Sequence, residues 1–160
     1  MKKIIILFSF FVVFTLAVSG QEYRTGIGAR VLFSNGLTIK YFISSGTAVE
    51  GLLTARFHGY NFTGLYEIYT EPFSVSNLYF YYGFGGHIGS WHSPAGKNWW
   101  DDGANHSVIG IDGIAGIEYN FGNVPFSISL DFKPGINIIG YPKLWVDELA
   151  LSVRYVWGNR

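Results

Sequence analysis

Large apolar side chains alternate with small or polar ones along most of the chain after Gln21. The stretch Phe126–Pro134 is typical, because Phe, Ile and Leu at its even positions alternate with Ser, Asp and Lys at its odd positions. Successive side chains of a strand point to opposite faces, so this pattern predicts a strand with one apolar and one polar face. No segment after Gln21 shows a sustained helical period. Eight such strands are expected: Arg24–Phe33, Leu37–Ile43, Ala48–His58, Phe62–Thr70, Leu78–Ser90, Ser107–Phe121, Phe126–Ile136 and Glu148–Trp157.

The connections between these segments indicate an up-and-down arrangement. Ser34-Asn35-Gly36 joins the first two segments, and Asn-Gly between alternating runs is a strong hairpin signal. If consecutive strands are antiparallel, the two longest links, Trp91–His106 and Asn137–Asp147, leave the sheet on the same side. Short turns on one side and longer loops on the other are typical of outer-membrane barrels. We therefore expect an all-β fold, an eight-stranded antiparallel up-and-down transmembrane β-barrel with short periplasmic turns and longer extracellular loops.

The two faces of the predicted strands differ sharply in charge. One face carries the Phe, Ile, Leu and Val side chains and no charged residue. The other face carries eleven charged residues, with several Ser, Thr and Gly: Arg24, Arg30, Lys40, Glu50, Arg56, Glu67, Asp112, Glu118, Asp131, Lys133 and Arg154. If the charged face lines the lumen, the barrel lies in a membrane. If the apolar face does, the protein is a secreted soluble barrel that binds an apolar ligand, as lipocalins do.

Volume and charge favour the membrane orientation. The interior of an eight-stranded barrel is only just wide enough for side chains to fill it, and the apolar row, rich in Phe and Tyr, is too bulky for that space. The charged row holds six cations and five anions. Such a near balance suits buried charges, which must be paired. We expect these eleven residues to form a charge network that plugs the lumen and leaves no open pore.

The aromatic residues mark one end of the expected barrel. Tyr119, Phe121, Phe126, Tyr155 and Trp157 all lie at the short-turn ends of their strands. Aromatic side chains gather at the two membrane–water interfaces of barrel proteins. The pattern predicts an interfacial girdle at this end.

Composition and the N-terminus support an exported protein. Charged residues make up 14% of the 160 residues, against about 25% in typical soluble domains. The formal net charge is zero, which does not favour nucleic acid as a partner. Lys2 and Lys3 precede the apolar run Ile4–Val18, and Val18-Ser19-Gly20 supplies small residues before Gln21. This predicts a signal peptide at 1–20 and a single barrel domain at 21–160. The chain has no cysteine, so neither disulfides nor a lipoprotein anchor is expected.

Together, the signal peptide, the eight alternating strands, the run Gly110–Tyr119 and the ending ALSVRYVW resemble the small OmpA/OmpX-type barrels, the "porin family" of Gram-negative bacteria. The resemblance covers the whole chain after the signal peptide. It implies a place in the outer membrane, contact with lipopolysaccharide, and insertion by the barrel-assembly machinery. In that family an aromatic residue of the last strand guides insertion. Tyr155 and Trp157 fit this role, whereas Ser152 stands where the family prefers glycine.

The loop after the fifth segment carries the candidate contact residues. Trp91, Trp99 and Trp100 are expected to be exposed, and exposed aromatic residues are common in recognition surfaces. The same region holds His87, His92, His106, Asp101 and Asp102, but without the tight spacing of a metal site. His92 and Ser90 share a face with no acidic residue placed beside them, so a lipid-modifying enzyme is the least favoured hypothesis. No catalytic, cofactor-binding or metal-binding residue is predicted, and the expected role is structural or adhesive through the two longer loops.

Overall fold

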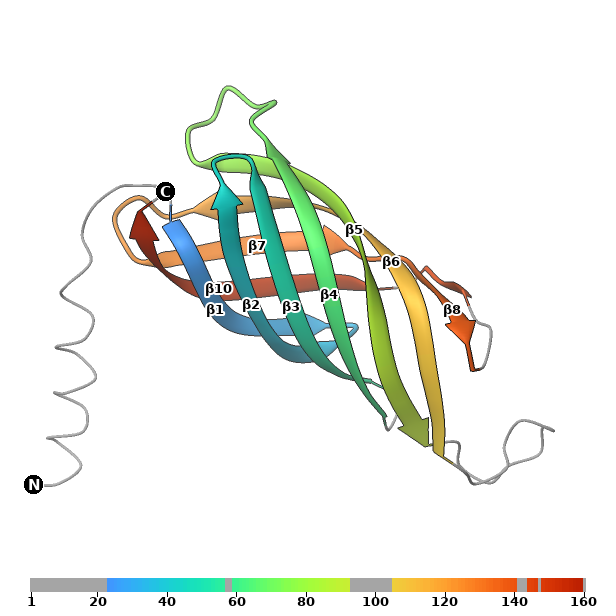
Figure 1. The fold of residues 1–160 in the computed structure, drawn as a ribbon. Coiled ribbons are helices and arrows are strands. Elements are labelled where there is room, and N and C mark those ends of the chain that lie inside the picture. The colour runs from blue at the N-terminus through green and yellow to red at the C-terminus, as the bar shows by residue number, and fades with distance from the viewer. Residues whose placement is uncertain (1–22, 57–58, 93–104, 141–143, 147, 160) are drawn as a thin grey trace, which may run out of the picture.

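A computed structural model describes residues 23–56, 59–92, 105–140, 144–146 and 148–159 (Figure 1), without the side chains of Arg56, Trp91, His92, Trp145 and Asn159. The predicted signal peptide at 1–20 lies outside these residues. Within them, no helix is long and apolar enough to cross a membrane. The described chain forms ten strands: β1 (Tyr23–Leu32), β2 (Asn35–Ser44), β3 (Thr47–Arg56), β4 (Gly59–Thr70), β5 (Leu78–His92), β6 (Asn105–Asn120), β7 (Phe126–Phe132), β8 (Gly135–Ile139), β9 (Leu144–Trp145) and β10 (Leu149–Asn159).

Eight of these strands close into a barrel. Strands β1 to β7 pair antiparallel with their neighbours in chain order, β10 pairs with β7, and β1 pairs with β10 to complete the ring. At the closing seam, Ile27 lies opposite Tyr155 and Val31 opposite Leu151. The predicted eight-stranded antiparallel up-and-down barrel is confirmed. Closure leaves none of these eight strands with an open edge along the closed part of the wall.

The seventh predicted strand is interrupted. Phe126–Ile136 was expected to be continuous, but the strand breaks after Phe132, and β8 begins at Gly135. Proline has no backbone N–H to donate to the ladder, so Pro134 ends the regular pairing. Its carbonyl still accepts a hydrogen bond of 2.8 Å from the Gly113 N–H. Beyond the break, β8 pairs with β6 on one side and with the short β9 on the other.

The first hairpin turns two residues earlier than the Asn-Gly signal indicates. Arg30 pairs with Gly36, so the chain reverses around Leu32 to Ser34, and the positive φ of 103° falls on Leu32. Gly36 is already part of β2, opposite Thr54 of β3. A β-carbon at Gly36 would lie 2.8 Å from the Thr54 Cα. Glycine at this position therefore allows two strands to approach closely and does not form the turn.

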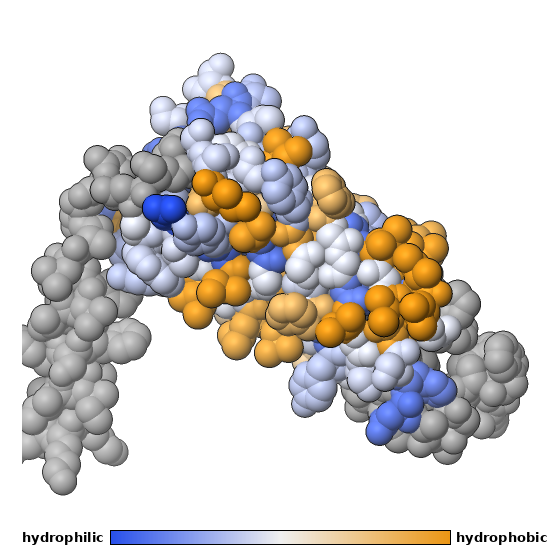
Figure 2. Space-filling model, viewed as in Figure 1, coloured by the Kyte–Doolittle hydropathy of each residue, from blue (hydrophilic) through white to orange (hydrophobic). Residues whose placement is uncertain are grey.

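The two faces of the barrel are chemically distinct. Apolar residues cover much of the outer surface (Figure 2), and Phe84 and Tyr60 are exposed to 67% and 73%. The alternation therefore places the apolar row outside. Exposed members of that row include Ile27, Val31, Leu37, Ile39, Leu53, Phe62, Phe84, Ile88, Ile109, Ile111, Ile117, Leu130, Phe132, Leu149 and Val153.

Aromatic rings also fill part of the interior, although the alternation predicts only polar and small side chains there. Tyr23, Phe42, Tyr69 and Tyr81 are buried. Phe42 packs edge-on against Tyr23 and Tyr69, with ring centroids 5.0 and 4.8 Å apart. Tyr69 stacks on Tyr81 at 5.1 Å. These tyrosines bring hydroxyl groups into the charged lumen and contribute to filling it.

Candidate functional site

The charged residues of the inner face make up the candidate site. Of the eleven expected there, nine are buried: Arg30, Lys40, Glu50, Glu67, Asp112, Glu118, Asp131, Lys133 and Arg154. They come from seven wall strands and from the link between β7 and β8, because each strand contributes alternate side chains to the lumen. The side chain of Arg56 lies outside the described part.

Arg24 departs from the prediction. Its side chain is exposed, and its guanidinium carbon lies 5.3 Å from the centre of the Tyr41 ring. The reason is local to the start of β1. Tyr23 takes the inner position there, and its hydroxyl donates to the Glu118 carboxylate at 2.5 Å. Regular alternation begins only at Gly26, so the rule that places Arg30 inside does not hold for Arg24.

Glu148 belongs to the lumen although it was not predicted there. It is buried just before β10 and accepts a hydrogen bond of 3.0 Å from the Ser34 hydroxyl. It also lies 3.0 Å from the Lys133 ammonium and 3.7 Å from the Arg30 guanidinium. A signal was present in the sequence, because Glu148 shares its parity with Arg154 and Ser152.

Arg154 is the centre of the network near the girdle end. Its guanidinium lies 2.5 Å from the Glu50 carboxylate and 3.4 Å from that of Glu118. It also donates to the hydroxyls of Ser129 at 2.8 Å and Thr38 at 3.1 Å. The Thr38 hydroxyl in turn donates to Glu50. One cation therefore links groups from β2, β3, β6, β7 and β10.

Lys40 occupies a second cationic position beside Arg154. Its ammonium lies 2.9 Å from Glu67, and 3.4 Å from both Glu50 and Glu118. It donates to the Tyr69 hydroxyl at 2.6 Å and lies 4.3 Å from the centre of the Tyr81 ring. An ammonium near an aromatic ring gains a cation–π interaction in addition to its ion pairs.

Arg30 and Asp131 form the middle layer. The guanidinium contacts both carboxylate oxygens, at 2.6 and 2.9 Å. This two-point arrangement is the strongest geometry for an arginine–carboxylate pair. The Tyr81 hydroxyl donates to the same carboxylate at 3.0 Å. The pair therefore fastens β1 to β7 across the lumen, with β5 attached through Tyr81.

A third cluster lies toward the end of the barrel at which β5 ends and β6 begins. The Lys133 ammonium lies 3.1 Å from Asp112, whose other oxygen lies 2.7 Å from the Nδ1 atom of His87. The Nε2 atom of His87 lies 2.8 Å from the Asn137 side-chain oxygen. Glycine makes room for this cluster, because a β-carbon at Gly110 would lie 2.6 Å from His87 Nε2. The cluster joins β5, β6 and β8 through side chains.

The arrangement is that of a filled interior. Arg30, Lys40 and Arg154 have side chains that are 0% exposed, whereas an open water channel would leave such groups accessible. Among the described residues, four buried Lys or Arg side chains face six buried carboxylates, so acidic groups outnumber them. No group of three His, Asp or Glu side chains in this part of the chain could hold a metal ion.

Most of the other candidate residues lie outside the part of the chain that the structure describes. Trp99, Trp100, Asp101 and Asp102 lie outside the described residues, and only the backbones of Trp91 and His92 are described, at the end of β5. His87 faces the lumen while Ser90 of the same strand faces outward. Nothing in the described part of the chain therefore joins a serine, a histidine and an acid into a catalytic set.

Comparison with known proteins identifies no family. No protein-family model matches the chain, and no curated protein matches its sequence.

Proposed function

We propose that the protein is an integral outer-membrane β-barrel with a plugged lumen. The observation that carries this proposal is the inversion of the two faces: the exposed outer wall is apolar, and the charged side chains are buried and paired inside. Water-soluble proteins rarely expose large contiguous apolar surfaces. In a bilayer, the same surface contacts hydrocarbon, and the closed ladder pairs the backbone groups of neighbouring strands along the closed part of the wall.

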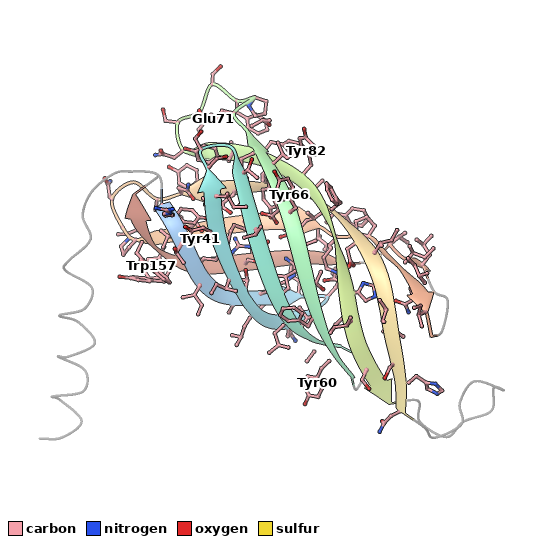
Figure 3. All side chains as sticks on the ribbon, in the orientation of Figure 1. Tyr41, Tyr60, Tyr66, Glu71, Tyr82 and Trp157 are labelled. Atoms are coloured by element: carbon pink, nitrogen blue, oxygen red, sulfur yellow. The ribbon has the colours of Figure 1, made fainter. Side chains whose placement is uncertain are left out.

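Aromatic side chains mark the two edges of the apolar surface. Tyr41, Tyr66, Tyr82 and Trp157 point outward in the half of the barrel nearer the link with Glu71, and Tyr60 lies near the opposite end (Figure 3). At the first end, the Tyr155 ring lies within 6 Å of Phe126 and Trp157, with centroids 5.7 and 5.9 Å away. This clustering supports the predicted girdle.

The height of the apolar surface suits a bilayer. On β6, the outward-facing apolar positions run from Tyr119 to Ile109. The ten residue-to-residue steps from Ile109 to Tyr119, at ~3.4 Å each and tilted by about 40°, span roughly 25 Å along the barrel axis. That is about the height of the apolar band on outer-membrane barrels. Beyond Ile109, the outward side chains of Ser107 and Asn105 are polar.

The filled lumen favours a structural or adhesive role. With the charged side chains sealed from water, solute passage has no route through the described interior. Surface interaction would instead use the regions Trp91–His106 and Asn137–Asp147, including Trp91, Trp99 and Trp100. The resemblance to OmpA/OmpX-type barrels adds three proposals: export by the signal peptide, insertion by the barrel-assembly machinery, and contact with lipopolysaccharide in the Gram-negative outer membrane.

The soluble alternative needs the opposite orientation. A lipocalin-like carrier of an apolar ligand would place the row containing Leu130 and Phe132 inside the barrel. In the structure both side chains are exposed, while Asp131 between them is buried. In the described part of the chain, no set of residues is assembled that would support an enzymatic role.

Membrane fractionation combined with a heat-modifiability gel tests the proposal. The full-length protein, expressed in a Gram-negative host, is expected in the outer-membrane fraction. Its folded form should migrate differently from the boiled form, because a closed barrel resists unfolding by detergent until it is heated. Recovery in the soluble periplasmic fraction, with no migration shift, would refute membrane insertion.

A further inference from the structure

The outer surface carries very few charges. Among the Lys, Arg, Asp and Glu side chains that the structure describes, all are buried except two, those of Arg24 and Glu71. Glu71 lies in the link between β4 and β5, outside the barrel wall. Arg24 is therefore the one cation on the outer wall of the described part. A charge there requires an explanation, because charged side chains on the lipid-facing surface destabilise barrels except near the interfaces.

The start of β1 directs Arg24 outward. Tyr23 fills the adjacent inner position with its hydroxyl on Glu118. Gly158, with a φ of 81°, lies beside Arg24, and a β-carbon at Gly158 would be 3.2 Å from the Arg24 Cβ. Glycine on the neighbouring strand thus leaves space for the arginine side chain on the outer surface.

Exposed aromatic residues lie near the start of β1 on both neighbouring strands. The guanidinium carbon of Arg24 lies 5.3 Å from the centre of the Tyr41 ring. Thr25, the next residue, pairs with Tyr41 on one side and with Trp157 on the other. Tyr41 and Trp157 are both exposed. Arg24 therefore lies within the girdle, at the level where lipid head groups meet the barrel in the proposed orientation.

Within the part of the chain that the structure describes, Arg24 makes no ion pair with a carboxylate, in contrast to the buried Arg30 and Arg154. A guanidinium presents its N–H donors in a planar fork that matches a phosphate bidentately, and its flat face stacks on aromatic rings. The Tyr41 ring holds that face, so the donors at the edge of the group are available to an external anion.

We propose that Arg24, Tyr41 and Trp157 form a binding site for the phosphate of a phospholipid head group. The lipid belongs to the leaflet at the short-turn end of the barrel. Arg24 binds the phosphate, Tyr41 orients the guanidinium, and Trp157 contacts the lipid beside the head group. This inference rests on the proposed membrane location and adds a specific ligand to it.

The test measures lipid binding by the refolded barrel in a neutral detergent. Native mass spectrometry follows a titration with dihexanoyl phosphatidylglycerol. Arg24→Gln is expected to weaken binding about tenfold, because a charge-assisted hydrogen bond is lost, and Arg24→Lys by only about threefold. Glu71→Gln is the matched control, since it removes the other exposed charge of the described part and should leave binding unchanged. Each variant is first checked for folding by heat modifiability.

Three arms identify the ligand. Dihexanoylglycerol, which lacks the phosphate, should bind weakly and equally to the wild type and Arg24→Gln. Inorganic phosphate at the same concentration should not displace the lipid. Equal affinity of wild type and Arg24→Gln for dihexanoyl phosphatidylglycerol would overturn the proposal. So would wild-type binding of dihexanoylglycerol as tight as that of dihexanoyl phosphatidylglycerol, or displacement of the lipid by inorganic phosphate.

Insertion is scored separately, by quenching of tryptophan fluorescence with brominated phospholipids in vesicles. Quenching in both wild type and Arg24→Gln, combined with equal lipid affinity, would refute only the phosphate site. Absence of quenching in the wild type would refute the membrane location and the site together.

Discussion

Asp131 shows how a single buried carboxylate can hold three strands. It accepts two hydrogen bonds from Arg30 and one from the Tyr81 hydroxyl. Both partners of the ion pair have fully buried side chains, so neither has water to replace a lost contact. Removing one partner lowers the stability mainly because the other charge is left buried and unpaired, and less because the attraction between the two is lost.

Asp131→Ala should therefore destabilise the barrel by about 3–5 kcal/mol, because it leaves the Arg30 guanidinium buried without its bidentate partner. The measurement is the free energy of unfolding in urea, in lipid or detergent. Ser152→Ala is the matched control. Ser152 lies opposite Arg30 and is fully buried, but its hydroxyl has no hydrogen-bond partner among the described residues. If Asp131→Ala and Ser152→Ala lower the free energy of unfolding by similar amounts, the Arg30–Asp131 pair does not stabilise the barrel.

Single residues also show where the sequence was informative. Alternation placed nine charged residues inside, because one inward position fixes every second position along a regular strand. It failed for Arg24, where an inward Tyr23 breaks the alternation, and it could not pair particular charges. The contact of Arg154 with Glu50 joins residues 104 positions apart. Such pairing depends on barrel register, which a single strand pattern does not specify.

At the scale of elements, the interrupted seventh strand is held by side chains. Pro134 breaks the ladder between β7 and β8, and the cluster of His87, Asp112 and Asn137 then attaches β8 to β5 and β6. The sequence contained the proline, but alternation continues past it from Lys133 to Ile136. The hydrophobic pattern therefore predicted one strand where the backbone forms two.

Gly110→Ala tests this attachment. A β-carbon there would clash with the His87 ring and the Ile136 carbonyl, so β8 must shift away from β6. We expect a loss of roughly 1–3 kcal/mol in the free energy of unfolding, and faster amide hydrogen exchange in β8 than in β10.

The control for this substitution lies on the same strand. At Gly113, the nearest atom to an added β-carbon is Pro134 Cγ, at 3.7 Å, so Gly113→Ala should change exchange in β8 very little. Equal exchange in the two variants would show that the His87 cluster does not hold β8.

For the whole molecule, the orientation of the two faces decides its environment. Leu130 lies on the outer wall between the paired residues Leu151 and Ile117. Leu130→Arg should reduce the stability of the barrel in lipid vesicles by about 2–4 kcal/mol, because it places a charge near the middle of the hydrocarbon layer. The measurement is reversible unfolding in vesicles. Leu130→Val keeps the site apolar and should cost far less. Unimpaired folding of Leu130→Arg would refute a lipid-facing position.

The same orientation leads to a prediction about transport. Paired charges fill the middle of the lumen, and the rings of Tyr23, Phe42 and Tyr69 pack together at the girdle end. Both regions lie within one closed wall, so the described interior offers ions no water-filled path along the axis. We expect the protein, reconstituted into a planar bilayer, to give no steady conductance in 1 M salt. A bilayer that receives detergent without protein gives the background conductance. The protein is taken from the outer-membrane fraction and shown to be heat-modifiable before use, so that only folded barrels are measured. A stable conductance step in every insertion would show that the interior opens in the membrane, and the structural or adhesive role would then give way to a channel.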